Sequence, residues 1–154
     1  MSLRVGEKAP EFDVVSSAGK TLKLSDFAGK KNVVLYFYPG DFTPLCTKET
    51  CGFRDMMGDL ESADTEVIGV SVDSNESHEK FAAKHKVPFA LVSDKDRQLA
   101  KTYGATSFLG NLLGKVGRVT FVIDKKGVIA GVFASELSAS KHVDGVKAAI
   151  RQLA

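Results

Sequence analysis

The chain has 154 residues, 44% of them hydrophobic and 26% charged, and its 21 basic and 19 acidic residues give a net charge of +2. This composition is typical of a soluble globular protein and excludes a disordered chain, so we expect a single domain over residues 1–154. No block of like charges provides a field for nucleic acid or anionic lipid, and every apolar run is too short to cross a bilayer.

The N-terminal part of the chain predicts a β-hairpin and then a buried strand. Residues 12–15 and 21–24 flank the turn-prone stretch Ser16-Ser17-Ala18-Gly19, which indicates a short hairpin that covers an edge of the fold. Residues 32–38 form a continuous apolar and aromatic run, the pattern of a strand buried on both faces, and Pro39 ends it.

Helices and strands then alternate. Apolar residues recur at helical spacing after Pro44 and predict one helix over residues 45–63. Residues 66–72 predict a second buried strand, and the polar residues 73–76 favour the start of a helix that runs to Lys86.

The rest of the chain predicts a short strand, a helix, a hairpin and a final helix. Residues 87–92 form the strand, and Ser93-Asp94 caps a helix that Gly104 stops. Residues 105–117 indicate a loop or short helical insertion, and the hairpin strands at 119–124 and 128–133 flank Lys125-Lys126-Gly127. An amphipathic helix carrying Val143, Val146, Ile150 and Leu153 closes the chain. This order predicts an α/β, thioredoxin-like fold with an added N-terminal β-hairpin and an inserted strand and helix.

The two cysteines, Cys46 and Cys51, are too few for a disulfide-rich framework, and the three histidines lie too far from them in sequence for a zinc motif. We therefore expect no metal and no other cofactor. Cys46 falls in the first turn of the predicted helix, where free N–H groups and the helix dipole favour a thiolate. It is either a nucleophile or a small core residue.

The spacing of the two cysteines constrains what they can do together. An ideal helix separates the Cα atoms of residues five apart by about 8.6 Å, whereas disulfides rarely bridge more than about 7 Å. The pair can therefore bond only if the helix locally unwinds. This suits a cycle in which Cys46 reacts first and Cys51 attacks afterwards; alternatively, Cys51 is an inert residue on the buried side of the helix.

The residues before Cys46 have the pattern P-x-x-x-T-x-x-C, formed by Pro39, Thr43 and Cys46. The Thr43 hydroxyl can act as a helix N-cap and can also hold a small polar substrate over the sulfur. Pro39 and Pro44 either punctuate the loop or, beside the sulfur, keep water away.

The segment YFYPGDFTPLCTKETCGFRD resembles the active-site segment of the peroxiredoxins, and the cysteine spacing resembles their Q-type, or bacterioferritin comigratory protein, subfamily. The segments VGEKAPEF, LSDFAGKKNVVLYFYP, EVIGVSVDS, PFALVSD and GRVTFVID follow in the family's order, so the resemblance covers nearly the whole chain. It implies a peroxiredoxin architecture in which Cys46 is the peroxidatic cysteine and Cys51 the resolving one. Pro39, Thr43 and Arg118 would complete the active site.

Arg118 precedes a predicted core strand, whose end can present a permanent cation to the thiolate and to the departing hydroxide or alkoxide. Alternatively, Arg118 faces the solvent.

Glu49, one turn beyond Cys46, either orients such an arginine or is a solvated helix carboxylate. Arg54 and Asp55 match the family's F-R-D stretch and have a structural interpretation. The chain departs from the subfamily at Leu45 and Gly40, which we expect to alter the shape of the substrate site more than its chemistry.

The resemblance implies a cofactor-free, antioxidant thiol peroxidase that reduces hydrogen peroxide and organic hydroperoxides. It further implies a Cys46 sulfenic acid, a Cys46–Cys51 disulfide and a thioredoxin-like reductant. A monomer resistant to overoxidation is expected, in the cytoplasm or, if a transit peptide has been removed, in a plastid.

Two alternatives remain at this point. The first is a thioredoxin-like disulfide reductase, although the pair is not C-x-x-C. The second is a redox sensor or interaction module that the same disulfide switches. Its partner surface would be the apolar segment 108–113, for which core packing and a wall of the substrate site are the other interpretations.

Overall fold

The computed structural model describes residues 3–105, 116–135 and 138–153. Its centre is a five-stranded sheet in the order β5-β4-β3-β6-β7. Strands β3, β4 and β5 are parallel to one another, and β6 and β7 are antiparallel to their neighbours. The strands are β3 (Asn32–Phe37), β4 (Thr65–Ser71), β5 (Ala90–Ser93), β6 (Val119–Ile123) and β7 (Ile129–Ala134).

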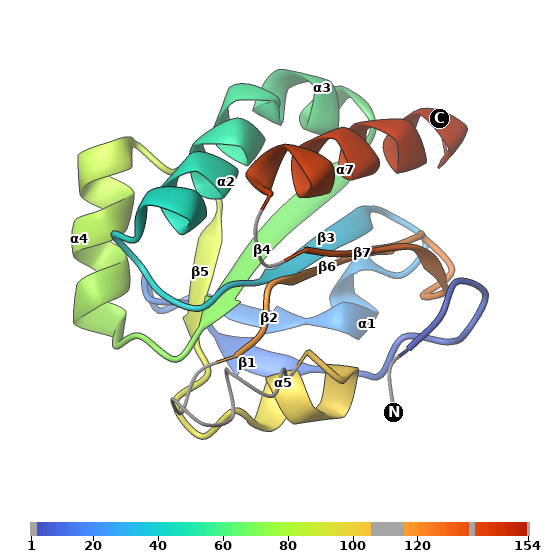
Figure 1. The fold of residues 1–154 in the computed structure, drawn as a ribbon. Helices are drawn as coiled ribbons and strands as arrows, with labels where there is room; N and C mark the ends of the chain where they lie inside the picture. Colours follow the sequence, from blue (N-terminus) through green and yellow to red (C-terminus); the bar gives the residue numbers. More distant parts are fainter. Residues whose placement is uncertain (1–2, 106–115, 136–137, 154) are drawn as a thin grey trace.

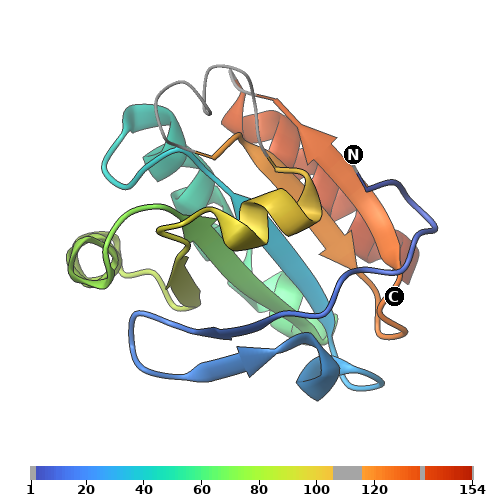
Figure 2. The same ribbon diagram turned by 90° about the horizontal axis from the view of Figure 1, so that it is seen from below.

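Helices and a separate hairpin cover the two faces of this sheet (Figures 1 and 2). One face carries the helices α2 (Pro44–Asp55), α3 (Met57–Ser62), α4 (Asn75–His85) and α7 (Ala139–Leu153). The opposite face carries α1 (Leu24–Phe27), α5 (Gln98–Tyr103) and the hairpin of β1 (Asp13–Val15) and β2 (Thr21–Lys23).

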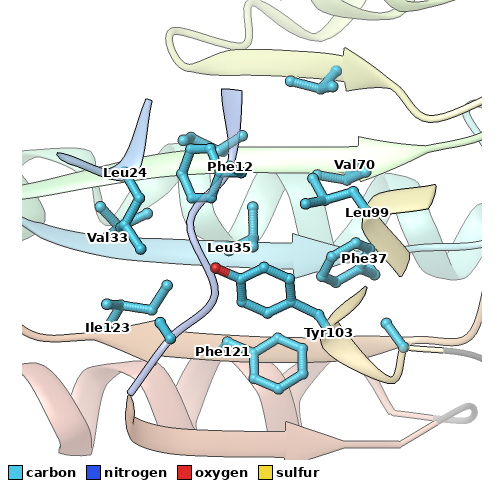
Figure 3. Close-up of a cluster of buried hydrophobic side chains, with 14 of the residues drawn as sticks. Phe12, Leu24, Val33, Leu35, Phe37, Val70, Leu99, Tyr103, Phe121 and Ile123 are labelled. Atoms are coloured by element: carbon cyan, nitrogen blue, oxygen red, sulfur yellow. The ribbon is translucent and has the colours of Figure 1, made fainter. Parts of the chain in front are cut away.

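Strand β3 divides its side chains between two hydrophobic cores because successive residues of a strand point to opposite faces. Val33, Leu35 and Phe37 pack on the side of the hairpin and α5, as Figure 3 shows. The alternate residues Val34 and Tyr36, followed by Tyr38, pack under α2 and α7. All six residues of β3 are buried, which confirms the interpretation of the continuous apolar run.

The predicted N-terminal hairpin is confirmed as β1 and β2, which form a sheet of their own. Its turn contacts the edge of the central sheet, since the Ser17 amide donates to the Leu91 carbonyl of β5 at 2.8 Å. Phe12, next to β1, packs in the core on this face (Figure 3). The hairpin thus covers the edge strand as expected.

The prediction of one continuous helix over residues 45–63 is wrong, because the segment forms α2 and α3 with a break at Met56. Met56 has φ −101° and ψ 11°, and its amide donates to the Phe53 carbonyl at 3.2 Å, three residues back. The weak helix former Gly58 follows. The break keeps Met56 and Leu60 buried in the same core as Phe53.

The elements around β5 and α5 are confirmed in type but shifted in position. The strand predicted at 87–92 forms at Ala90–Ser93, since Pro88 cannot donate a ladder hydrogen bond. Helix α5 begins only at Gln98, yet both oxygens of the predicted cap Asp94 accept hydrogen bonds, from the Leu99 and Ala100 amides.

The ends of the later elements also follow the sequence pattern. Gly104 ends α5 with a φ of 71°, a left-handed conformation that glycine adopts without strain. The hairpin β6–β7 and the helix α7 are confirmed, with Val146 and Ile150 buried on the inner face of α7. The expected loop at 105–117, including the apolar segment 108–113, lies largely outside the described residues.

Candidate active site

Cys46 lies in the first turn of α2, directly after the loop that follows β3. Thr43 occupies the N-cap position and Pro44 the first helical position, where its missing N–H and fixed φ are compatible with a helix start. The Thr47 amide closes the first turn on the Thr43 carbonyl at 2.9 Å. Cys46 is fully buried, so its sulfur is shielded from bulk water.

Strand pairing brings Arg118 to this helix start. Val119, the first residue of β6, pairs with Phe37, the last residue of β3. Arg118 therefore lies at the end of these two inner strands, where the loop to α2 begins. Its Nη2 donates to Cys46 Sγ at 3.0 Å. Arg118 is 3% exposed, which rules out the solvent-facing alternative.

Glu49 completes an ion pair with the same guanidinium. Its Oε1 accepts from Arg118 Nη1 at 3.1 Å, and its side chain is fully buried. The interpretation of Glu49 as a solvated carboxylate is therefore wrong. Arg118 places one arm of its fork on a carboxylate and the other on the sulfur, a geometry that the point charge of a lysine cannot reproduce.

Thr43 and Pro39 lie in the loop before Cys46. The Thr43 hydroxyl donates to the Gly40 carbonyl at 2.9 Å and makes no side-chain cap to α2, which differs from the N-cap interpretation. This hydrogen bond closes a tight turn over residues 40–43. The threonine hydroxyl binds a carbonyl of the preceding loop in place of an amide of α2, as short polar side chains can. Pro39 is half-buried in the same loop.

Cys51 lies on the same continuous helix as Cys46, and both cysteines are free. It is half-buried and faces a hollow of about 330 Å³ between α2 and α7, whose walls include Lys48 and Val143. Gly52 follows, and a Cβ there would approach Val143 Cγ2 to 2.7 Å. The intact helix keeps the two thiols from bonding, as the spacing predicts.

A buried polar network around Asp41 was not found from the sequence. Asp41 Oδ1 accepts from the Tyr38 hydroxyl at 2.7 Å, while its Oδ2 accepts from Ser77 Oγ at 2.9 Å and lies 2.8 Å from His78 Nδ1. The network ties the loop between β3 and α2 to α4. An aspartate in a Gly-Asp turn looks like an ordinary loop residue, so no sequence signal marked it.

His142 is a second residue that the sequence analysis missed. Its Nδ1 lies 2.8 Å from Thr120 Oγ1 and 3.4 Å from Glu49 Oε2, and its side chain is fully buried. His142 falls on the apolar stripe of α7, four residues before Val146. A polar residue on such a stripe is the signal that would have identified it.

Tyr36 borders the same site, and its hydroxyl lies 2.9 Å from Thr50 Oγ1. Burial raises the pKa of Tyr36 well above its usual value, and the nearby Glu49 and Cys46 raise it further. The phenol therefore stays neutral, and the charged groups around the sulfur are Arg118 and Glu49.

The described part of the chain contains no cluster of three or more histidine, cysteine or acidic side chains arranged to hold a metal ion. Among those same residues, no helix has the length and apolar character needed to span a membrane. The chemistry that the site does offer is a helix-terminal sulfur with a guanidinium in contact, an arrangement that stabilises a thiolate and the negative charge leaving it.

Comparison with known proteins gives this geometry a context. The family model described as AhpC/TSA family matches residues 5–132. Peroxiredoxin Bcp of Bacillus subtilis (strain 168) is 44% identical over 131 residues, which are 82% of this chain and 82% of that protein. The chloroplastic Peroxiredoxin Q of Populus jackii is 43% identical over 139 residues, which cover 90% of this chain but only 64% of that protein's length.

Solved structures are similar over nearly the whole chain. Peroxidoxin BcpB from Mycobacterium tuberculosis has a TM-score of 0.89 at 32% identity, covering 99% of each chain. A bacterioferritin comigratory protein from Xanthomonas campestris, described for its alkyl peroxide reduction activity, has a TM-score of 0.82 at 30% identity, covering 92% of this chain and 90% of that one. These similarities confirm the expected α/β, thioredoxin-like fold.

Proposed function

The chain belongs to the AhpC/TSA family, and on this premise we propose that it is a thiol-dependent peroxidase that reduces hydrogen peroxide and organic hydroperoxides. The observation that carries the proposal is the 3.0 Å contact between Arg118 Nη2 and Cys46 Sγ at the start of α2. The alkyl peroxide reduction described for the Xanthomonas protein supports organic hydroperoxides as part of the substrate range.

In the first step, the Cys46 thiolate attacks the terminal oxygen of the hydroperoxide. An S–O bond forms as the O–O bond breaks, sulfur gives up two electrons, and hydroxide or alkoxide leaves and takes a proton. Arg118 stabilises the negative charge both on the sulfur and on the leaving oxygen. Cys46 is left as a sulfenic acid.

Thr43 and Pro39 have positioning roles in this proposal. The Thr43 hydroxyl donates its hydrogen to the Gly40 carbonyl, so its oxygen is left to accept a hydrogen bond from the O–H of a hydroperoxide at the helix start. Pro39 keeps the loop rigid and excludes water from the sulfur.

In the second step, residues 46–51 unwind and the Cys51 thiolate attacks the sulfur of the sulfenic acid. An S–S bond forms as the S–O bond breaks, and the oxygen leaves as hydroxide, which takes up the proton that the Cys51 thiol released and becomes water. A thioredoxin-like dithiol then reduces the disulfide. The free cysteines on a continuous α2 represent the reduced state of this cycle.

Bacterial and chloroplastic proteins both occur among the relatives, and they support two compartments. We propose a cytoplasmic protein that acts as a monomer, with a plastid as the alternative compartment. The intramolecular pair Cys46–Cys51 supports the monomer, because a complete cycle needs no cysteine from a second copy.

The test is turnover of hydrogen peroxide and an alkyl hydroperoxide, coupled to thioredoxin and its NADPH-dependent reductase. Cys46→Ser should abolish turnover, whereas an unchanged rate in this variant would overturn the proposal. A disulfide reductase would instead reduce insulin without consuming peroxide. A redox sensor would be oxidised once, without sustained turnover.

The role of Cys51 is tested separately. After one equivalent of peroxide, mass spectrometry of Cys51→Ser should show a persistent sulfenic acid on Cys46, because its resolving partner is missing. The unsubstituted protein should lose the mass of two hydrogens and show a Cys46–Cys51 disulfide. An unaltered catalytic cycle in Cys51→Ser would remove Cys51 from the mechanism.

A further inference from the structure

His142 lies at the far end of a line of buried contacts that leads to the reactive sulfur. His142 Nε2 is 2.9 Å from the Ser135 carbonyl oxygen. A carbonyl only accepts hydrogen bonds, so Nε2 must carry the hydrogen. This fixes the tautomer and leaves Nδ1 to face Thr120 and Glu49.

The two oxygens of Glu49 and the two terminal nitrogens of Arg118 connect His142 to the sulfur. Glu49 Oε2 faces His142 Nδ1 at 3.4 Å, and Glu49 Oε1 accepts from Arg118 at 3.1 Å. Arg118 then uses its other terminal nitrogen for the sulfur at 3.0 Å. The orientation of the carboxylate therefore determines where the guanidinium points, and His142 is the group on the other side of that carboxylate.

The charges along the line also depend on His142. Arg118 and Glu49 cancel when Cys46 is a thiol, whereas a Cys46 thiolate adds one buried negative charge. A proton on His142 Nδ1 would donate to Thr120 Oγ1 at 2.8 Å and would place a positive charge 3.4 Å from Glu49 Oε2. That charge would offset the thiolate and leave more of the Arg118 charge for the sulfur. Buried charges are tolerated when they are paired in this way.

On the basis of the proposed function, we propose that His142 is a positioning residue for peroxide reduction. Hydrogen-bonded to Thr120, its ring lies at ion-pair distance from Glu49 and keeps that carboxylate oriented so that Arg118 is directed at Cys46. A proton on the ring favours the thiolate form of Cys46. His142 acts through Glu49 and Arg118 and does not touch the substrate.

Polar groups from three elements of the described part of the chain face His142. Helix α2 contributes Glu49, β6 contributes Thr120, and the segment after β7 contributes the Ser135 carbonyl. Tyr36 of β3 is near Glu49 but stays neutral, because burial raises its pKa. On α7 itself, Lys141 and Asp144 are exposed, so water screens their charges.

The experiment compares His142→Gln with the parent in a Cys51→Ser background, so that only Cys46 reacts. The glutamine amide reaches the Ser135 carbonyl as Nε2 does, but it leaves the Nδ1 position empty and carries no charge. The readouts are the rate of Cys46 alkylation by iodoacetamide across a pH series and the rate of sulfenic acid formation with one equivalent of peroxide.

At about pH 7 we expect both rates to fall about tenfold in His142→Gln. At about pH 9.5 the thiolate forms without help, so the alkylation rates of variant and parent should converge. A fall by the same factor at every pH, or an unchanged profile in a folded variant, would overturn the proposal. Alkylation needs no peroxide, so it tests His142 even if the proposed peroxidase activity fails.

Two further variants test whether the position of a polar group at His142, its charge, or the packing of the protein accounts for the effect. His142→Asn puts an uncharged amide at the Nδ1 position, so it should recover part of the peroxide rate without recovering the parent's pH profile. If His142→Gln does not fold, this variant carries the test. Lys141→Gln removes an exposed charge beside His142 on α7, and it should leave the alkylation profile of Cys46 unchanged.

Discussion

Two buried histidine–carboxylate pairs flank the start of α2, and they differ in what lies beyond them. In each pair, both side chains are fully buried: His78 faces Asp41 at 2.8 Å, and His142 faces Glu49 at 3.4 Å. The side-chain contacts of Asp41 end on Tyr38, Ser77 and His78, whereas those of Glu49 continue through Arg118 to the sulfur. The same chemical pair thus anchors a loop in one place and leads to the Cys46 sulfur in the other.

The closed network around Asp41 explains why the loop before Cys46 is well defined. His78 Nε2 lies 3.0 Å from the Val92 carbonyl, so this nitrogen carries a hydrogen, and Nδ1 faces Asp41 Oδ2 at 2.8 Å. The Asp41 amide also donates to Asp73 Oδ2 at 2.8 Å. The loop is held to α4 and to the segment after β4 through hydrogen bonds that water cannot replace.

Alkaline pH should have the largest effect, because it acts on both regions at once. Tyr38 hydrogen-bonds Asp41, Tyr36 lies near Glu49, and burial raises the pKa of both phenols and of Tyr103. A raised folded pKa gives stability that is complete below the unfolded pKa of about 10 and is lost as pH rises above it. With three such groups, the loss approaches about 4 kcal/mol per pH unit.

Ultraviolet titration at the tyrosinate band, beside circular dichroism, checks this expectation. The chain has three tyrosines, so the band reports these residues alone. Tyrosinate absorbance should stay low while the protein is folded and should appear together with unfolding. Stepwise ionisation of the folded protein near pH 10 would contradict the expected burial effect.

Asp41→Ala should cause the largest loss of stability among single substitutions. It leaves the Tyr38 hydroxyl and the His78 ring without their buried acceptor, and breaking a buried pair in this way costs about 3–5 kcal/mol. The measurement is the free energy of unfolding from urea denaturation. Asp73→Ala is the milder control, because it removes an acceptor for the Asp41 amide and the Ser71 hydroxyl without stranding a histidine. Equal losses in the two variants would remove the distinction.

Arg118→Lys should disrupt the contacts that join Glu49 to the Cys46 sulfur, and its main effect should be on the rate of peroxide reduction. Lysine keeps the positive charge but cannot hold Glu49 and the sulfur with a planar fork. We expect kcat/KM for hydrogen peroxide to fall about a hundredfold, within the range for removing one transition-state donor. Coupled NADPH oxidation measures it. The matched control is Arg54→Lys, at a half-buried arginine that binds Asp55 and the His85 carbonyl and does not contact the sulfur. A fall of less than about threefold would show that charge alone is sufficient.

The sequence predicts the strands and helices of the fold better than it predicts the buried polar contacts around Asp41 and Glu49. The run at 32–38 predicts β3 because apolar periodicity records which faces are buried. Cys46 and Arg118 were predicted as site residues from a helix start, a strand end and a family resemblance, and the structure brings them into contact. The break at Met56 was missed because apolar residues continue on both sides of it, and local turn geometry leaves no mark in that pattern.

The two histidine–carboxylate pairs illustrate a further limit. Asp41 and His78 are 37 residues apart, and His142 is 22 residues from Thr120, so only tertiary packing brings these groups together. A polar residue in a loop or on a helix usually indicates solvent, and its burial becomes evident only with the fold. For His142, its place on an apolar stripe was the one local signal.

Gly52, packed against Val143, influences the competition between disulfide formation and overoxidation at Cys46. A sulfenic acid on Cys46 either meets Cys51 or meets a second peroxide, which converts it irreversibly to sulfinic acid. Glycine favours the helix by about 1 kcal/mol less than alanine, so α2 carries beside Cys51 a residue that speeds its opening. We expect this to shorten the lifetime of the vulnerable intermediate, so that inactivation requires much higher peroxide concentrations than catalysis does.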